Sequence, residues 1–150
     1  MSWAVDTNVL LRMTDVGHAA QPTAERSLKV LGLSESPRIF PQTLIEFWAV
    51  ATRSRADNGL ALSISDVGSQ LNRLKRMFVL LNYTPEVFSA WERIVSRYQV
   101  AGKQAHDAHI VAAMSAHKVT HLLTFNDRDF KRFTEITVVN PSSIKMIDSE

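Results

Sequence analysis

The chain has 150 residues, of which 45% are hydrophobic and 21% are charged, with a net charge of +2 and a pI near 9.2. This length and composition predict a single globular domain over residues 1–150. The absence of cysteine excludes disulfides, thiolate metal sites and a cysteine nucleophile, so any chemistry must use oxygen, nitrogen or a hard metal ion. The small positive charge permits a nucleic-acid partner without requiring one. We expect a cytoplasmic protein with no membrane partner, because no apolar run is long enough to span a bilayer and no secretory leader is visible.

Strand-like and helix-like segments alternate along the first half of the chain. An apolar run over residues 3–5 stops at Asp6, and a helical pattern follows over residues 8–13. A second strand is predicted over residues 38–40, and Pro41 ends it before another helix. Four apolar residues recur at helical spacing in that helix: Leu44, Phe47, Trp48 and Ala51.

The alternation continues after an Asn-Gly turn signal at residues 58–59. Ser65 is expected to cap a helix with one apolar face, and an extended segment follows over residues 79–81. Thr84 and Pro85 begin a helix whose predicted buried stripe is Phe88, Trp91 and Val95. A further helix is predicted over residues 105–118, after Gly102, and strands over residues 121–125 and 136–139. Short apolar strands that alternate with helices predict an α/β fold with a mainly parallel sheet covered by helices.

Acidic residues follow the predicted strands or open the helices after them. Ligands of such folds bind beyond the carboxyl ends of the strands, so these acids are expected to meet at one edge of the sheet. They are Asp6, Glu46, Asp107, Asp127 and Asp129. Two carboxylates about 4 Å apart repel by roughly 4 kcal/mol at an effective dielectric constant near 20, so a cation is needed among them. Mg²⁺ and Mn²⁺ prefer such oxygen ligands, and the chemistry they favour is phosphodiester hydrolysis.

Each acid also has a simpler structural interpretation. Asp6 could cap the helix that follows it, and Glu46 could form a capping box with Thr43. Asp127 and Asp129 could be ordinary turn residues. Capping explains Asp107 less well, because it shares a helical face with apolar residues.

Histidine, basic and tryptophan side chains give weaker signals. His106 and His109 flank Asp107, but without a clear third histidine nearby they do not predict a zinc site, and His106 is a candidate substrate contact. Both Trp48 and Trp91 are expected in the core rather than stacked on bases. The candidate RNA contacts, with a solvated helix face as the alternative for several, are Arg53, Arg55, Lys103, Arg128, Lys131 and Arg132.

Together these motifs resemble the PIN domain nucleases and, within them, the VapC-type toxins of bacterial toxin–antitoxin pairs. The similar segments are AVDTNVLLR, LIEFWAVATR, HDAHIVAAM and HLLTFNDRDF, and the resemblance covers nearly the whole chain. It implies an α/β/α sandwich with a central, mainly parallel sheet.

The resemblance also implies a site. Asp6, Glu46 and Asp107 correspond to ligands of Mg²⁺ or Mn²⁺, and Asn126 takes a fourth position that is acidic in the full family pattern. Since Asn126 is neutral, Asp127 or Asp129 has to supply the fourth charge, and Asp127 is chosen as the fourth catalytic acid. The supporting or substrate-contacting candidates are Asn8, Thr124, Asn126, Asp129, Lys103 and Arg128.

The function implied is a metal-dependent endoribonuclease, the toxin of a pair, with RNA as substrate, an antitoxin as partner and a homodimer as its assembly. The alternative is a catalytically inactive PIN module that acts as an RNA- or protein-binding scaffold, which the neutral Asn126 favours. A receiver-type signalling domain fits less well, because the sequence lacks paired acids after the first strand.

Overall fold

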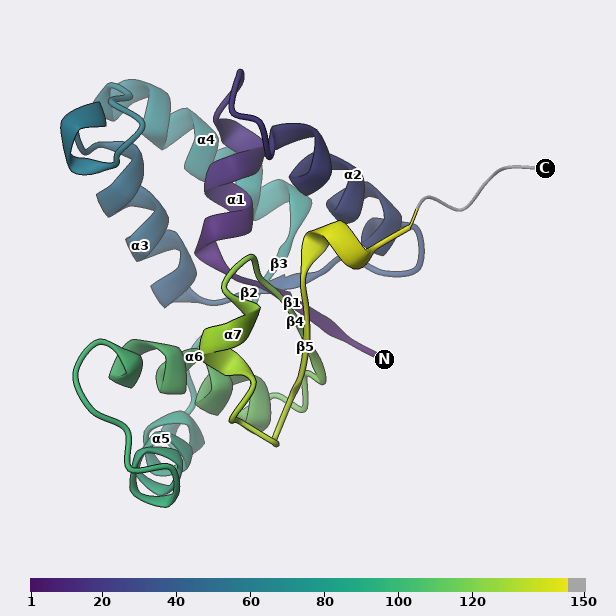
Figure 1. The fold of residues 1–150 in the computed structure, drawn as a ribbon, viewed down its shortest axis with the longest axis vertical. Helices are drawn as coiled ribbons and strands as arrows, with labels where there is room; N and C mark the ends of the chain where they lie inside the picture. The colour runs from purple at the N-terminus through teal and green to yellow at the C-terminus, as the bar shows by residue number, and fades with distance from the viewer. Residues whose placement is uncertain (146–150) are drawn as a thin grey trace.

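The computed structural model describes residues 1–145, which form five short strands and seven α-helices (Figure 1). The strands are β1 (Trp3–Val5), β2 (Arg38–Ile39), β3 (Val79–Leu80), β4 (His121–Leu123) and β5 (Thr137–Val139). The helices are α1 (Thr7–Thr14), α2 (Gln21–Gly32), α3 (Pro41–Ala51), α4 (Ile64–Met77), α5 (Pro85–Arg97), α6 (Gln104–Ala116) and α7 (Asp127–Phe130). Two 3₁₀ turns lie at Arg55–Asp57 and Pro141–Ser143.

All neighbouring strands of the sheet are parallel, in the order β3-β2-β1-β4-β5. The chain builds outward from β1 to β3 on one side and then returns to place β4 and β5 on the other. The strand order therefore reverses between β1 and β4, and such a switch point opens a crevice at the carboxyl ends of the strands.

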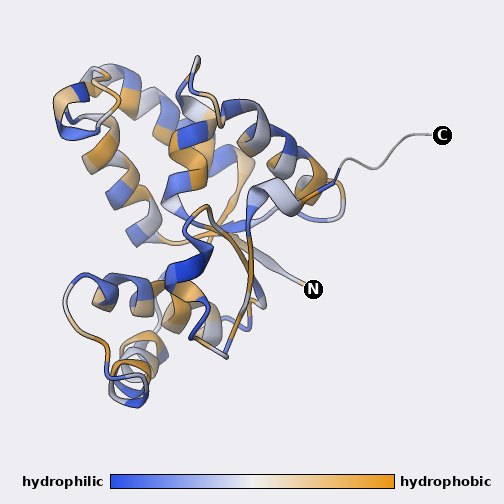
Figure 2. Cartoon of the chain, in the orientation of Figure 1, coloured by the Kyte–Doolittle hydropathy of each residue, from blue (hydrophilic) through white to orange (hydrophobic). Residues whose placement is uncertain are grey.

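Each face of the sheet packs on its own hydrophobic core. Val5 and Leu123 pack with residues of α1 to α4, whereas Ala4 and Leu122 pack with residues of α5 and α6. Successive strand residues point to opposite faces, so a sheet with both faces covered must be apolar in consecutive positions. Figure 1 shows α1 to α4 on one side of the sheet and α5 and α6 on the other, and Figure 2 shows hydrophobic residues in the strands and in the helices of both layers. The predicted three-layer sandwich with a parallel sheet is confirmed.

Several local predictions are wrong. The helix α2 was not predicted, although Ala24, Leu28 and Leu31 recur at helical spacing and are buried on it. The cap of α4 is Ser63, not Ser65, because the Ser63 side chain accepts the bond from the Asp66 amide.

The buried stripe of α5 is also shifted from its predicted position. Val87, Ala90 and Ile94 are the buried residues, whereas Phe88 is 62% exposed. The predicted stripe begins one residue too late in the sequence, and for that reason it wrongly includes the exposed Phe88 among the core residues.

No helix within residues 1–145 is long and apolar enough to cross a membrane.

Candidate active site

Asp6 lies at the point where β1 ends and α1 begins. Its backbone amide donates to the carbonyl of Leu123 at 3.0 Å, so the residue continues the sheet for one more step. Its side-chain Oδ1 accepts from the Thr7 amide at 2.8 Å and caps α1. The capping interpretation of Asp6 is therefore correct, yet it uses only one carboxylate oxygen, and Asp6 also lines the crevice.

The second oxygen of Asp6 joins a network that ties β1 to β4. Oδ2 accepts from Thr124 Oγ1 at 2.8 Å and from Asn8 Nδ2 at 3.2 Å. Asn8 also accepts from the amide of Phe125 at 3.0 Å, and the Asn126 amide donates to Thr124 Oγ1 at the same distance. Thr124 is fully buried. The network fixes Asp6 at the switch point of the sheet.

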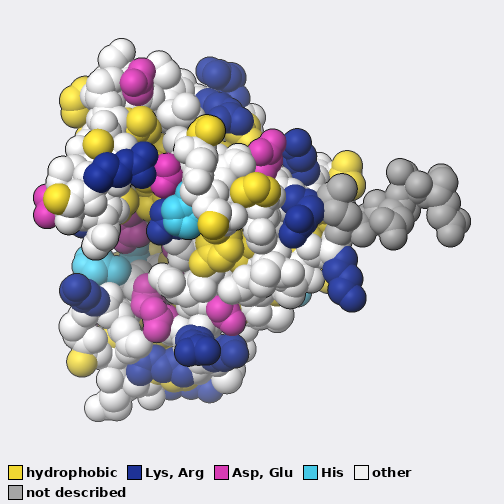
Figure 3. Space-filling model, turned by 45° about the horizontal axis from the view of Figure 1, so that its top comes forward, with side chains coloured by type: hydrophobic (Ala, Val, Ile, Leu, Met, Phe, Trp, Pro, Cys, Tyr) yellow, Lys and Arg dark blue, Asp and Glu magenta, His cyan; other side chains and the backbone are white. Residues whose placement is uncertain are grey.

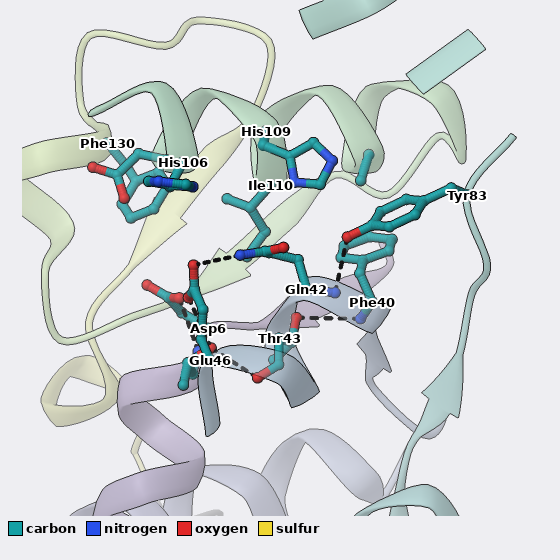
Figure 4. Close-up of a pocket in the computed structure, with 13 residues that line it drawn as sticks. Asp6, Phe40, Gln42, Thr43, Glu46, Tyr83, His106, His109, Ile110 and Phe130 are labelled. Atoms are coloured by element: carbon teal, nitrogen blue, oxygen red, sulfur yellow. Dashed lines mark hydrogen bonds between the residues drawn. The ribbon is translucent and has the colours of Figure 1, made fainter. Parts of the chain in front are cut away.

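Glu46 reaches the same place from the second turn of α3. Its Oε1 accepts from Gln42 Nε2 at 3.0 Å, and its Oε2 accepts from Thr7 Oγ1 at 3.3 Å (Figure 4). The capping-box interpretation of Glu46 is wrong: Phe40 is the N-cap, and its amide donates to Thr43 Oγ1. Glu46 thus turns away from the backbone and toward Asp6.

Asp107, in the first turn of α6, completes the group of acids. It lines two adjoining hollows together with Asp6 and Glu46, one of which is bordered by α6 and Tyr83 and the other by Asn8, Arg53 and Asn126. Three segments that are far apart in the sequence therefore bring carboxylates to one crevice.

The electrostatics of the crevice disfavour the charged form of these acids. Burial, and to a lesser extent the charge of Glu46, raises the pKa of Asp6 to about 6 despite the hydrogen bonds that it accepts. Burial also raises the pKa of Asp107 to about 6, with repulsion from Asp6, Asp129 and Glu46 adding to it. Carboxylates that repel one another in a poorly solvated crevice favour the binding of a positive charge.

The turn after β4 places its polar residues differently. Asn126 is exposed and lines the hollow beside Arg53. Asp127 accepts from Asn140 Nδ2 at 3.1 Å and lies 3.9 Å from the Lys131 ammonium. Asp129 is exposed on α7, and its charge raises the pKa of Asp107.

Of the six basic candidates, Arg53 lines the acidic hollow. Arg55 instead forms a two-pronged ion pair with Asp15, and Arg132 donates to Gln104 and to the Tyr98 carbonyl. Lys103 and Arg128 are exposed at the beginning of α6 and on α7. Figure 3 shows acidic side chains inside the crevice, with histidine and basic side chains along its edges.

Three contributors to the site were missed from the sequence. Thr7 and Gln42 hold Glu46, and the hydroxyl of Tyr83 accepts from the Gln42 amide at 2.8 Å. Two sequence signals could have identified them: Thr7 directly follows Asp6, and Gln42 lies one helical turn before Glu46. Nothing local marks Tyr83, which the fold brings to the site.

The donor chemistry suits a hard divalent cation. The crevice offers carboxylate oxygens from three segments, and Mg²⁺ is commonly bound by one or two carboxylates together with water and substrate oxygens. Within residues 1–145, no three histidine, aspartate or glutamate side chains converge closely enough to hold an ion by themselves. An ion here would therefore need water or phosphate oxygens to complete its coordination.

Comparison with known families gives one match, to the family described as the PIN domain, over residues 4–136. No curated protein sequence matches significantly.

Solved structures share the fold at low sequence identity. VapBC2 from Rickettsia felis, bound to a DNA fragment from its promoter, is 15% identical with a TM-score of 0.72, over 93% of this chain and 98% of that one. FitAcB from Neisseria gonorrhoeae is 17% identical with a TM-score of 0.69, over 95% and 99%. Mycobacterium tuberculosis VapC20, described as a Sarcin-Ricin loop cleaving toxin, is 22% identical with a TM-score of 0.56, over 81% and 87%.

Proposed function

The chain belongs to the PIN domain family, and from this premise we propose that it is a metal-dependent endoribonuclease that acts as the toxin of a toxin–antitoxin pair. Members of the family are nucleases, which makes hydrolysis of a phosphodiester bond the general reaction. The divalent ion, the RNA substrate and the toxin role are the specific parts of the proposal.

The observation that carries the proposal is the shared crevice of Asp6, Glu46 and Asp107. The pKa of Asp6 and that of Asp107 are both raised to about 6, so keeping both acids charged at neutral pH is unfavourable unless a cation lies beside them. A structural ion pair would have lowered the pKa of these acids instead. Acids kept in this state at the switch point of a parallel sheet are better explained by ion binding than by stability.

In the proposed site, Asp6, Glu46 and Asp107 would hold Mg²⁺ or Mn²⁺. A bound divalent ion supplies positive charge to the phosphate and lowers the pKa of water, so no protein nucleophile is required. Asn8 and Thr124 keep the second oxygen of Asp6, Oδ2, in place through the hydrogen bonds that they donate to it. Arg53, at the edge of the acidic hollow, is placed to bind a neighbouring phosphate of the RNA.

A fourth acid would come from the turn after β4. Asp127 was chosen from the sequence, but its carboxylate already accepts from Asn140 and lies near Lys131. Asp129 acts electrostatically on Asp107. We therefore propose that Asp129 contributes more than Asp127 to the charge of the site.

Partners are proposed from the same relatives. The Rickettsia and Neisseria structures carry the paired names VapBC2 and FitAcB, and a further neighbour is described as a toxin-antitoxin complex from Klebsiella pneumoniae. We propose from that likeness that an antitoxin binds this chain, and the homodimer stays a prediction of the family resemblance.

The test is cleavage of labelled stem-loop RNAs, including a sarcin-ricin loop oligonucleotide, in Mn²⁺, Mg²⁺ or chelator. The wild type should cut at least one RNA only with a divalent ion, and Asp107→Asn should lose that activity. The matched control is Asp66→Asn, which removes an exposed acid of α4 outside the crevice and should leave cleavage unchanged. Equal metal-dependent cleavage by Asp107→Asn would contradict the assignment, and no cleavage of any RNA by the wild type would favour the inactive scaffold.

A further inference from the structure

A second cavity, of about 390 Å³, adjoins the acidic crevice between α5 and α6. Its walls include four apolar or aromatic side chains, Tyr83, Val87, Phe88 and Trp91, and the two imidazoles of His106 and His109. Tyr83, His106 and His109 also line the acidic crevice. Figure 4 shows these three side chains along one border of the crevice, and the second cavity shares this border.

The aromatic rings of this cavity are held in fixed positions. Trp91 donates from Nε1 to the Ala105 carbonyl at 2.9 Å, which fastens α5 to the beginning of α6. Phe88 stacks on Trp91, with ring centroids 5.7 Å apart and planes 25° from parallel. The Tyr83 ring lies 5.0 Å from the His109 ring, and its hydroxyl is bonded to the Gln42 amide. Side chains ordered in advance lose little entropy when a ligand binds.

Phe88 is the least expected member of this wall. It is 62% exposed, although Val87 and Ala90 beside it are buried. Phe88 is not isolated, because it lines one cavity together with Tyr83 and Trp91, and contiguous apolar surface of this kind marks binding sites. The Ile45 side chain is equally exposed on α3 but does not line the cavity, so apolar exposure alone does not define the feature.

We propose that this cavity binds one unstacked base of the RNA, next to the phosphate that lies at the acids. The inference rests on the proposed ribonuclease function and extends it to substrate recognition. Single-stranded RNA is recognised by bases that leave the helix and stack on aromatic or histidine side chains. The rings of Phe88 and Trp91 provide such a surface, and the imidazoles of His106 and His109 provide polar groups for the edge of the base.

The border that the cavity shares with the acidic crevice favours this occupant over a second copy of the chain. The base of a nucleotide next to the cleaved bond has to lie beside the acidic crevice. The cavity meets this requirement, because Tyr83, His106 and His109 line both spaces. Because the stacking surface accepts the face of any base, the cavity predicts a requirement for an unpaired nucleotide rather than for one particular base.

The experiment measures the affinity of fluorescein-labelled oligouridine for a set of Phe88 variants, all carrying Asp107→Asn so that the RNA stays intact. Phe88→Tyr keeps the ring, Phe88→Leu keeps an apolar side chain without a ring face, and Phe88→Ala removes both. Ile45→Ala is the matched control for an exposed apolar side chain. Light scattering on the same samples reports the oligomeric state.

If the cavity binds a base, Phe88→Leu and Phe88→Ala weaken binding about tenfold, while Phe88→Tyr and Ile45→Ala bind as the parent does. Equal affinity of the parent and Phe88→Leu overturns the base-binding cavity and leaves the nuclease proposal intact. A change from dimer to monomer in Phe88→Ala, with the affinity of Phe88→Leu unchanged, assigns the surface to a contact between copies and also overturns it. No binding of oligouridine by the parent overturns it as well, and the separate cleavage assay then decides whether the proposed function falls with it.

Discussion

The Thr124 hydroxyl donates a hydrogen bond of 2.8 Å to the Asp6 carboxylate, across 118 residues of sequence. This bond joins the ends of β1 and β4 at the switch point. Thr124→Val keeps the shape but removes the donor to Asp6 and the acceptor of the Asn126 amide. We expect a loss of about 1–3 kcal/mol in the free energy of unfolding, and weaker Mn²⁺ binding because Asp6 is less well oriented.

The measurement for this variant is urea unfolding together with a Mn²⁺ titration. Thr137→Val, an exposed position of β5, is the control and should change neither quantity. An unaltered Mn²⁺ affinity in Thr124→Val would show that the bond does not orient the site.

The raised pKa of Asp6 predicts a stability that depends on pH. The folded protein keeps this proton to a pH of about 6, whereas the unfolded chain releases it near 3.8. The folded state therefore binds more protons between these values, so the contribution of Asp6 to stability falls as the pH rises through them. In chelator, the stability of Asp6→Asn relative to the wild type should therefore rise by on the order of 2 kcal/mol between pH 4 and pH 7.

Urea unfolding at several pH values checks this difference. Asn remains an acceptable helix cap, but its Nδ2 cannot accept the bonds that Thr124 and Asn8 donate to Asp6 Oδ2. That loss changes stability equally at every pH, so the part of the difference that varies with pH reports the charge of Asp6. Addition of Mn²⁺ near pH 7 should raise the free energy of unfolding of the wild type more than that of Asp6→Asn. A difference between the two proteins that stays constant with pH would contradict the raised pKa.

The turn after β4 offers a direct comparison of two neighbouring acids. Asp129→Asn should lower metal-dependent cleavage, because its charge is felt at Asp107. Asp127→Asn should have the smaller effect on cleavage, since its carboxylate bonds to Asn140. Cleavage rates of both variants, measured side by side, decide the order, and a larger loss in Asp127→Asn would return the fourth acid to the residue chosen from the sequence.

Two arginines separated by one residue should have opposite roles. Arg55 pairs with Asp15, whose side chain is only 7% exposed, so Arg55→Ala leaves a buried carboxylate unpaired and should cost about 1–2 kcal/mol of stability. Arg53 lines the acidic hollow, so Arg53→Ala should weaken RNA binding and its dependence on salt with little change in stability. Each variant is the control for the other in unfolding and RNA-binding experiments. Equal effects of the two on RNA affinity would contradict the separation.

Much of the fold could be predicted from the sequence because both faces of the sheet are covered. Consecutive apolar residues such as Ala4 and Val5 are needed by the two cores, and they mark a parallel strand clearly. The same pattern of strands and helices also predicted that Asp6 follows a strand and that Asp107 lies near the start of a helix. The cap of α4 and the register of the α5 stripe depend on single residues, and local patterns fix those poorly.

The geometry of the site could not be predicted because it depends on contacts over long sequence separations. Glu46 carried a capping-box pattern in the sequence, and only the packing of α3 against α1 brings the Thr7 hydroxyl to it. Tyr83 and Phe88 gain their roles from the way α5 lies beside α6. Helical periodicity identified an apolar stripe but not which rings border a cavity.

The most direct test of the central claim is a Mn²⁺ titration of the metal-free protein, in which electron paramagnetic resonance measures the free Mn²⁺. The account predicts saturable binding by the wild type, a loss of more than about tenfold in affinity for both Asp6→Asn and Asp107→Asn, and no change for Asp66→Asn. Wild-type affinity in both crevice variants, or no binding by the wild type, would contradict a divalent-ion site at these acids.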